Sequence, residues 1–128
     1  KAAMDQMILV FRQALKVNAD IILESNFHSE ELSEIYKICR EKDYKVCLLL
    51  LTGNKEILYE RFMARVPTRH KAHMSQKLNE SYDSFSKYID TLRNAKFVFP
   101  IHKIDVTYLS IEQVTDMALN YCASCGIV

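Results

Sequence analysis

The segment Tyr44-Lys45-Val46-Cys47-Leu48-Leu49-Leu50-Leu51 decides the fold class, because residues 46–51 form the longest unbroken apolar run in the chain. A short, continuous apolar run of this kind is typical of a strand buried on both faces of a parallel sheet. The run is far too short to cross a lipid bilayer. We therefore expect a central strand at 44–51 in a layered α/β domain.

On both sides of this strand, short apolar runs alternate with segments whose apolar residues recur at helical spacing. Ser29 is predicted to cap one helix, and Ser110 with Gln113 forms a capping-box pattern before the last helix. Strands that alternate with helices favour one α/β domain over residues 1–128, with a parallel sheet. We expect strands at 20–24, 44–51 and 104–109, and helices at 3–16, from Ser29, from Asn54 to near Pro67, from Ser75 to Leu92 and from Ser110 onward.

The composition indicates a folded domain, since 49% of the 128 residues are hydrophobic and 26% are charged. A net charge of +1 gives no general attraction to nucleic acids or membranes. The only two glycines, Gly53 and Gly126, exclude a glycine-rich phosphate loop or a dinucleotide fingerprint within these residues. Because the first residue is Lys1 rather than methionine, we expect a chain that was cut or processed at its start.

The four cysteines favour a reducing, cytoplasmic location over a disulfide framework. Cys39 and Cys47 fall on apolar faces of a predicted helix and strand, where a thiol behaves as a small hydrophobe. Cys122 and Cys125 form a single CxxC motif at a helix end. Structural zinc needs four ligands, and no second CxxC or paired-His motif completes the set. A metal or redox role for this pair is therefore the weaker alternative.

Polar residues follow the predicted strand at 20–24, at the edge where open parallel sheets bind ligands. Glu24 ends this strand, and Asn26 and His28 follow it closely. A carboxylate at such a position can accept a proton from a substrate hydroxyl or hold a water molecule on Mg²⁺. The alternative is that Glu24 caps loop amides. Residues 52–54 and those after Leu109 end the other two predicted strands in the same way.

The basic segment 61–79 holds five cations, two histidines and no acidic residue. Arg61 and Arg65 lie about one helical turn apart on the same face, and Arg69 follows just beyond Pro67. Arginine suits phosphate, because its planar fork donates two parallel charge-assisted hydrogen bonds. Phosphoryl transfer depends on such positioning and charge stabilisation. The alternative is a solvated helix face with no ligand.

Four stretches, IILESNF (21–27), VCLLLLTGNKEILYERFMARV (46–66), RHKAH (69–73) and KIDVTYLSIEQV (103–114), occur in a characteristic order. In this order the chain resembles the P-loop small-molecule kinases, in particular predicted ATP-dependent kinases grouped with chloramphenicol phosphotransferase and zeta-toxin-like proteins. The resemblance covers most of residues 20–121. It rests on a strand that ends in a carboxylate and a small polar loop (Glu24, Ser25, Asn26), on an R-x-x-x-R pattern (Arg61, Arg65), on an R-H-x-x-H element (Arg69, His70, His73) and on an ID-T strand end (Ile104, Asp105, Thr107).

The resemblance implies a three-layer α/β/α fold, a lid at about 65–76 and transfer of the γ-phosphoryl group of ATP to a small hydroxylated acceptor. It implies Mg²⁺ as cofactor and ATP as co-substrate only where the family's phosphate loop is present. The residue roles that it implies are a base or magnesium-water partner (Glu24), transition-state charge stabilisation (Arg69), ATP phosphate binding (Arg61, Arg65) and acceptor binding (Asn26, His28, His70, His73).

One departure is large, because the family's first strand leads into the Walker A loop, G-x-x-x-x-G-K-[ST], and this chain has no such segment. We therefore expect the C-terminal two-thirds of a kinase domain, without the first strand and phosphate loop, and no turnover from this chain alone. The alternative is a non-catalytic, degenerate P-loop-like domain that binds a partner or an anion. We expect the binding partner to be a small-molecule acceptor, and we expect no binding to membranes or nucleic acids. Whether the chain forms a homo-oligomer is left open.

Overall fold

The computed structural model describes residues 2–70, 81–94, 97 and 100–127. Helices and short strands are mixed along the chain, as expected of an α/β protein. The elements are α1 (Ala2–Lys16), α2 (Ser29–Glu41), β1 (Leu49–Thr52), α3 (Lys55–Arg65), the 3-10 helix η1 (Val66–Thr68), α5 (Tyr82–Arg93), β2 (His102–Asp105) and α6 (Ile111–Ser124).

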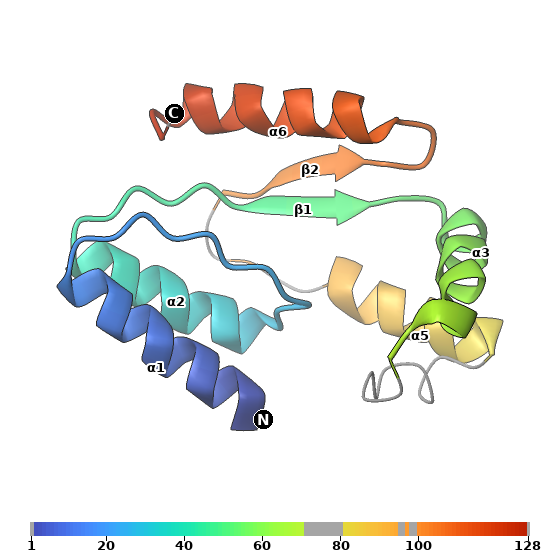
Figure 1. Ribbon diagram of the computed structural model, residues 1–128, viewed down its shortest axis with the longest axis horizontal. Coiled ribbons are helices and arrows are strands. Elements are labelled where there is room, and N and C mark those ends of the chain that lie inside the picture. The colour runs from blue at the N-terminus through green and yellow to red at the C-terminus, as the bar shows by residue number, and fades with distance from the viewer. Residues whose placement is uncertain (1, 71–80, 95–96, 98–99, 128) are drawn as a thin grey trace.

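The two strands form a parallel pair, in which Leu49 lies beside His102 and Thr52 lies beside Asp105. This confirms the expected combination of helices with a parallel sheet. Figure 1 shows α6 next to β2, whereas α1 and α2 lie on the opposite side of the strands in that view. The helices α3 and α5 lie together beyond the carboxyl end of β1. Both strands therefore end close to the α3–α5 pair.

The strand predictions were wrong in extent, because a strand needs a hydrogen-bonded neighbour as well as an apolar sequence. The predicted strand at 44–51 pairs only over Leu49–Thr52, and the one at 104–109 pairs over His102–Asp105. Residues 20–24 lie outside the sheet of the described part of the chain. Within this segment, Ile21 and Leu23 pack on the α1–α2 core, whereas Ile22 between them is 96% exposed. This alternation is that of an extended chain.

The helix predictions were closer to the structure, because helices hydrogen-bond within themselves. Helix α1 matches the predicted 3–16, and Phe11 and Leu15 are buried against α2. Helix α2 begins at Ser29 itself, with His28 as its N-cap, so the predicted cap was wrong by one residue. The reason is that the Glu31 carboxylate accepts a hydrogen bond from the His28 N–H at 2.8 Å, which closes the first turn around His28.

The later helices begin at hydrogen-bonded caps. The Asn54 side chain accepts from the N–H of Ile57 at 3.1 Å, and this bond starts α3. The predicted Ser110–Gln113 capping box at the start of α6 is confirmed. The described helix α5 starts at Tyr82 with Ser81 as its cap, and the predicted start at Ser75 lies outside the described residues.

Aromatic residues join α3 to α5, which positions both helices at the strand ends. The rings of Phe62 and Phe85 lie 5.5 Å apart and are both nearly buried. Tyr59 adds a second contact to Phe85 at 5.4 Å. On β2, Ile104 is fully buried, so the strand faces a packed layer. These contacts hold the C-terminal end of α5 beside Gly53, which follows β1.

Candidate functional site

A pocket of about 730 Å³ opens where β1 and β2 end, and we call it the strand-end pocket. Its volume lies in the range of small-molecule sites, about 300–1,000 Å³. It is at the carboxyl edge of parallel strands, where α/β proteins bind ligands. It is lined by Leu50, Thr52, Gly53, Asn54, Arg93, Lys103, Asp105, Thr107, Tyr108 and Leu109.

The floor of the pocket is a hydrogen-bond network centred on Thr107, which is only 6% exposed. The Thr107 N–H donates to the Asp105 carboxylate at 2.9 Å, and the Thr107 hydroxyl makes a second, short bond to the same oxygen. The hydroxyl oxygen also accepts from the Asn54 N–H at 2.8 Å. These bonds tie the ends of the two strands together. They also lower the pKa of the Asp105 carboxyl below its ordinary value, because both bonds favour the ionised form.

Gly53 lies in a tight space where the chain turns out of β1. A Cβ atom built at this position would lie 3.1 Å from the Thr107 Oγ1 and 3.3 Å from the Leu58 side chain. Any larger residue would therefore push against the network in the pocket floor.

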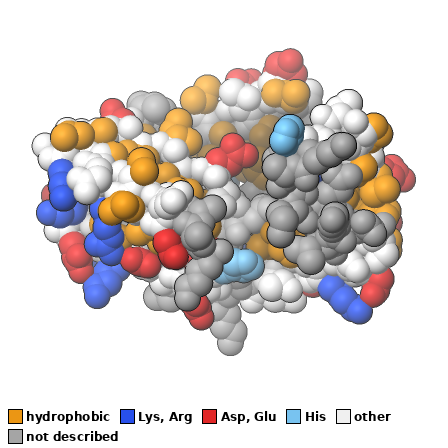
Figure 2. All heavy atoms as spheres, turned by 60° about the horizontal axis from the view of Figure 1, so that its bottom comes forward, with side chains coloured by type: hydrophobic (Ala, Val, Ile, Leu, Met, Phe, Trp, Pro, Cys, Tyr) orange, Lys and Arg blue, Asp and Glu red, His pale blue; other side chains and the backbone are white. Residues whose placement is uncertain are grey.

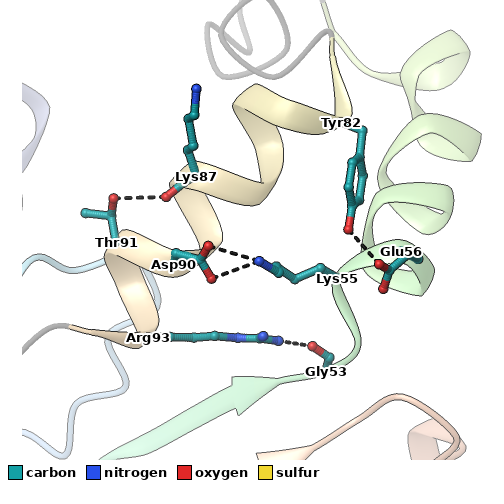
Figure 3. Close-up of polar contacts among 8 residues, drawn as sticks. All are labelled: Gly53, Lys55, Glu56, Tyr82, Lys87, Asp90, Thr91 and Arg93. Atoms are coloured by element: carbon teal, nitrogen blue, oxygen red, sulfur yellow. Dashed lines mark hydrogen bonds and ion pairs between the residues drawn. The ribbon is translucent and has the colours of Figure 1, made fainter.

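A clamp joins α3 to α5, and one of its residues, Arg93, lines the pocket; Figure 3 shows the clamp residues. The Lys55 ammonium lies between both oxygens of Asp90, at 3.0 and 2.9 Å. One turn further along α5, Arg93 donates to the carbonyl of Gly53. Arg93 lines the pocket, and this bond anchors the last turn of α5 to the residue that follows β1.

At the other end of the clamp, the Tyr82 hydroxyl donates to the Glu56 carboxylate at 2.7 Å (Figure 3). This bond lowers the pKa of Glu56 and raises the pKa of Tyr82, because it stabilises the carboxylate and the neutral phenol. It fixes the start of α5 on α3, and neither residue is among those that line the pocket.

Two side chains at the pocket remain available to a ligand. Within the described part of the chain, the Lys103 ammonium makes no hydrogen bond or ion pair. Tyr108 is 85% exposed and stands at the pocket edge beside Leu109. A free cation next to an exposed aromatic ring and an apolar side chain suits a ligand that combines a negative charge with a flat ring.

A second hollow, of about 530 Å³, lies on the other side of the last turn of α5, and we call it the α5 hollow. Residues 27–30, at the start of α2, face Thr91, Leu92 and Asn94 across it. Next to it, Asn26 makes a side-chain hydrogen bond to Tyr88, although burial is the larger effect and raises the pKa of this tyrosine. The structure thus brings two predicted acceptor residues, Asn26 and His28, to α5, which also carries Arg93.

Glu24, the predicted base, is exposed and lies in the extended segment before the α5 hollow. It is absent from the described linings of both hollows. Its predicted role in catalysis therefore stays a prediction.

The predicted arginine row has other partners. Arg61 donates to the carbonyls of Val106 at 3.0 Å and Thr107 at 2.7 Å, so its fork holds the loop after β2. Arg65 donates to the Arg61 carbonyl at 3.3 Å, and the guanidinium of Arg69 lies 4.9 Å above the Phe62 ring. Their predicted roles toward phosphate stay predictions.

The lid was predicted at about 65–76, and the structure describes only residues 65–70 of it. His70 is exposed, and His73 lies outside the described residues.

Arg93 and Lys103 were missed by the sequence analysis, because Arg93 belongs to no motif and Lys103, although it opens the stretch 103–114, was given no role there. The signal that could have found Lys103 is its position within the strand that carries the ID-T ending. No pattern marks Arg93, whose place depends on how α5 docks against β1. By contrast, residues 52–54 were predicted to end a strand, and they line the pocket. The other predicted stretch, after Leu109, is not part of the lining, because β2 ends at Asp105 and the pocket is lined there by Thr107, Tyr108 and Leu109.

The described residues contain no group of three or more His, Cys, Asp or Glu side chains arranged to hold a metal ion. In the same part of the chain, every helix is too short or too polar to span a bilayer. Figure 2 shows basic side chains next to acidic ones on the face that it presents, rather than a continuous basic patch.

Comparisons with protein-family models, with curated proteins and with solved structures find no match to this chain.

Proposed function

We propose that this chain takes part in ATP-dependent phosphoryl transfer to a small hydroxylated acceptor, with the nucleotide in the strand-end pocket and the acceptor in the α5 hollow. The observation that carries this proposal is that the two hollows flank one turn of helix, residues 91–94 of α5. A two-substrate transferase needs adjacent sites of this kind, because its catalysis is mostly positioning.

The chemistry of the strand-end pocket supports a nucleotide as its ligand. Lys103 offers a free cation for a phosphate group, and Tyr108 and Leu109 offer a surface for a base. Arg93 adds a second positive charge at the mouth, although one of its N–H groups already bonds to Gly53. In this proposal Glu24 and Asp105 are the carboxylates available to a magnesium-bound water, and the fold is the three-layer arrangement of P-loop kinases.

A second candidate function, non-catalytic anion binding, is favoured by the contacts of Arg61. Both terminal nitrogens of the Arg61 guanidinium donate to backbone carbonyls. This side chain therefore holds the loop after β2 and is not free to bind ATP. In that case the strand-end pocket would bind phosphate groups without recognising a base. The two candidates therefore differ in what the ligand must contain.

Calorimetric titration of the chain with Mg-ATP, tripolyphosphate and adenosine tests both candidates. Phosphoryl-transfer sites bind nucleotides through base and phosphate together, so we expect ATP to bind more tightly than either fragment. Equal affinities for ATP and tripolyphosphate would favour the anion site. Because the chain lacks a glycine-rich phosphate loop, we expect binding without turnover.

Two lysine variants separate the pocket from general charge effects. Lys103→Met should weaken ATP binding by roughly 10- to 100-fold, since a charge-assisted hydrogen bond is worth roughly 1.5–3 kcal/mol. Lys37→Met removes the same charge from α2, where the Lys37 side chain is 77% exposed and lies 4.0 Å from Glu41. Equal affinity losses in both variants would contradict a site at Lys103.

A further inference from the structure

Three cysteines meet where the end of α6 approaches the segment before β1. The Sγ atoms of Cys47 and Cys122 lie 3.4 Å apart, although the residues are 75 positions apart in sequence. Cys125 also interacts with Cys47, and it hydrogen-bonds to the Tyr121 side chain. All three cysteines are half-buried. The CxxC pair of the sequence therefore has a third thiol as its neighbour.

Two further contacts hold these segments together around the sulfur atoms. The Lys45 ammonium donates to the carbonyl of Gly126 at 3.2 Å. The rings of His102 and Tyr121 stack at 4.2 Å, which joins β2 to the last turns of α6. In Figure 1 the C-terminal end of α6 lies over the segment that leads into β1. The two sulfur atoms are thus held in contact by backbone and ring contacts on both sides.

We propose that Cys47 and Cys122 form a reversible disulfide that fastens α6 to the β1 segment when the protein meets a small-molecule disulfide such as oxidised glutathione. A disulfide has a sulfur–sulfur distance of about 2.0 Å, so the two side chains need to close by only a little more than an ångström. This inference is independent of the proposed phosphoryl transfer. It assigns a modification site at the opposite end of β1 from the strand-end pocket.

The order of the steps follows from the environment of Cys47. Burial, together with the neighbouring Cys122 and Cys125 thiols, raises the pKa of Cys47 to about 12, so it is the poorer nucleophile at neutral pH. Cys122 therefore attacks the glutathione disulfide first, forming a mixed disulfide and releasing one glutathione thiolate.

Cys47 then gives up its proton and attacks the Cys122 sulfur, and the second glutathione leaves. The two cysteines lose two electrons and two protons in total. One glutathione disulfide gains both and becomes two thiols.

The closed form should stabilise the molecule, because α6 is otherwise weakly held. No residue of α6 is buried in the described structure, and Ile111 and Leu119 are 83% and 52% exposed. A covalent bond across 75 residues removes much of the freedom of the unfolded chain. Oxidation should therefore raise the melting temperature, and reduction with dithiothreitol should return it to the starting value.

Peptide mapping of the oxidised chain tests the proposal. The chain is incubated with oxidised glutathione, free thiols are alkylated, and the product is cut with trypsin. Cleavage after lysine and arginine places Cys47 in peptide 46–55, Cys122 and Cys125 in 104–128, and the buried Cys39 in 38–40. We expect peptides 46–55 and 104–128 to be linked, Cys39 to be alkylated, and dithiothreitol to remove the link.

The variants Cys122→Ser and Cys125→Ser form a matched pair for assigning the bond. The link and the rise in melting temperature should persist in Cys125→Ser and be lost in Cys122→Ser. The proposal is overturned if the oxidised wild-type chain carries only glutathione adducts or a Cys122–Cys125 bond. It is also overturned if Cys125→Ser, rather than Cys122→Ser, loses the link.

Discussion

At the scale of single residues, Thr107 and Asp105 give the strand-end pocket its shape. The Thr107 hydroxyl joins the Asp105 side chain to the Asn54 N–H, so one buried residue connects the end of β2 with the start of α3. Arg61 supports the same loop by bonding to the carbonyls of residues 106 and 107. A ligand in this pocket would meet a floor that is already hydrogen-bonded before binding, which reduces the cost of ordering it.

The lowered pKa of Asp105 makes a prediction about acid stability. Because its pKa is lower in the folded than in the unfolded chain, Asp105 contributes stability above its ordinary pKa, about 3.9. This contribution is lost as the pH falls through the lowered value. In Asp105→Asn the side-chain oxygen can still accept from Thr107, but the charge is gone, so the free energy of unfolding should fall less steeply between pH 5 and pH 2.

Urea denaturation at a series of pH values measures this effect, with Asp116→Asn on the exposed surface of α6 as the control. The control should follow the wild-type curve. If the curve of Asp105→Asn also follows the wild-type curve, the bonds from Thr107 do not stabilise the ionised carboxylate.

At the scale of the elements, the helices could be predicted from sequence, whereas the strands could be predicted only in part. The spacing of Phe11 and Leu15, or the Ser110–Gln113 pattern, carries local information that a helix uses directly. The strand Leu49–Thr52 is set by its partner His102–Asp105, and residues 20–24 have a strand-like pattern without a paired strand in the described structure. Sequence cannot show which apolar run finds a neighbour.

The candidate site was predictable to a similar degree. The rule that ligands bind at the carboxyl ends of parallel strands pointed to residues 52–54, which line the strand-end pocket, but it placed the second stretch after Leu109, beyond the residues of the loop after β2 that line it. It could not show that Arg61 would reach the carbonyls of Val106 and Thr107, since that contact depends on how α3 packs beside β2. For the same reason, the place of Arg93 beside Gly53 was not predictable.

The α3–α5 clamp makes a prediction at the scale of the elements. Lys55→Met should lower the free energy of unfolding by about 1 kcal/mol, because its ammonium contacts both oxygens of Asp90 and its side chain is only 26% exposed. The control is Lys87→Met, which breaks the Lys87–Asp83 pair on α5, where both side chains are 76% exposed. In this control variant the free energy of unfolding should fall by less than about 0.5 kcal/mol.

Equilibrium denaturation of both variants provides the comparison. Indistinguishable losses would mean that the Lys55–Asp90 pair adds no more than a solvated surface pair. The position of Arg93 would then have to depend on the aromatic contacts between α3 and α5 instead.

At the scale of the whole molecule, the chain has two packed parts that meet at the strands. Helices α1 and α2 share a core of Phe11, Leu15, Ile35, Ile38 and Cys39, whereas α3 and α5 pack through aromatic rings (Figure 1). The last turn of α5 lies between the strand-end pocket and the α5 hollow, which is lined in part by the start of α2. The proposed two-substrate site therefore depends on both parts.

The most direct test of the proposed nucleotide site is a nuclear magnetic resonance titration of the isotope-labelled chain with Mg-ATP. The account predicts that the amide signals of Gly53, Asn54 and residues 105–109 shift together in a saturable way. The signals of α1, far from the pocket, should stay in place. Shifts confined to residues 61–70 of the basic segment, with the signals of the strand-end pocket unchanged, would contradict the account.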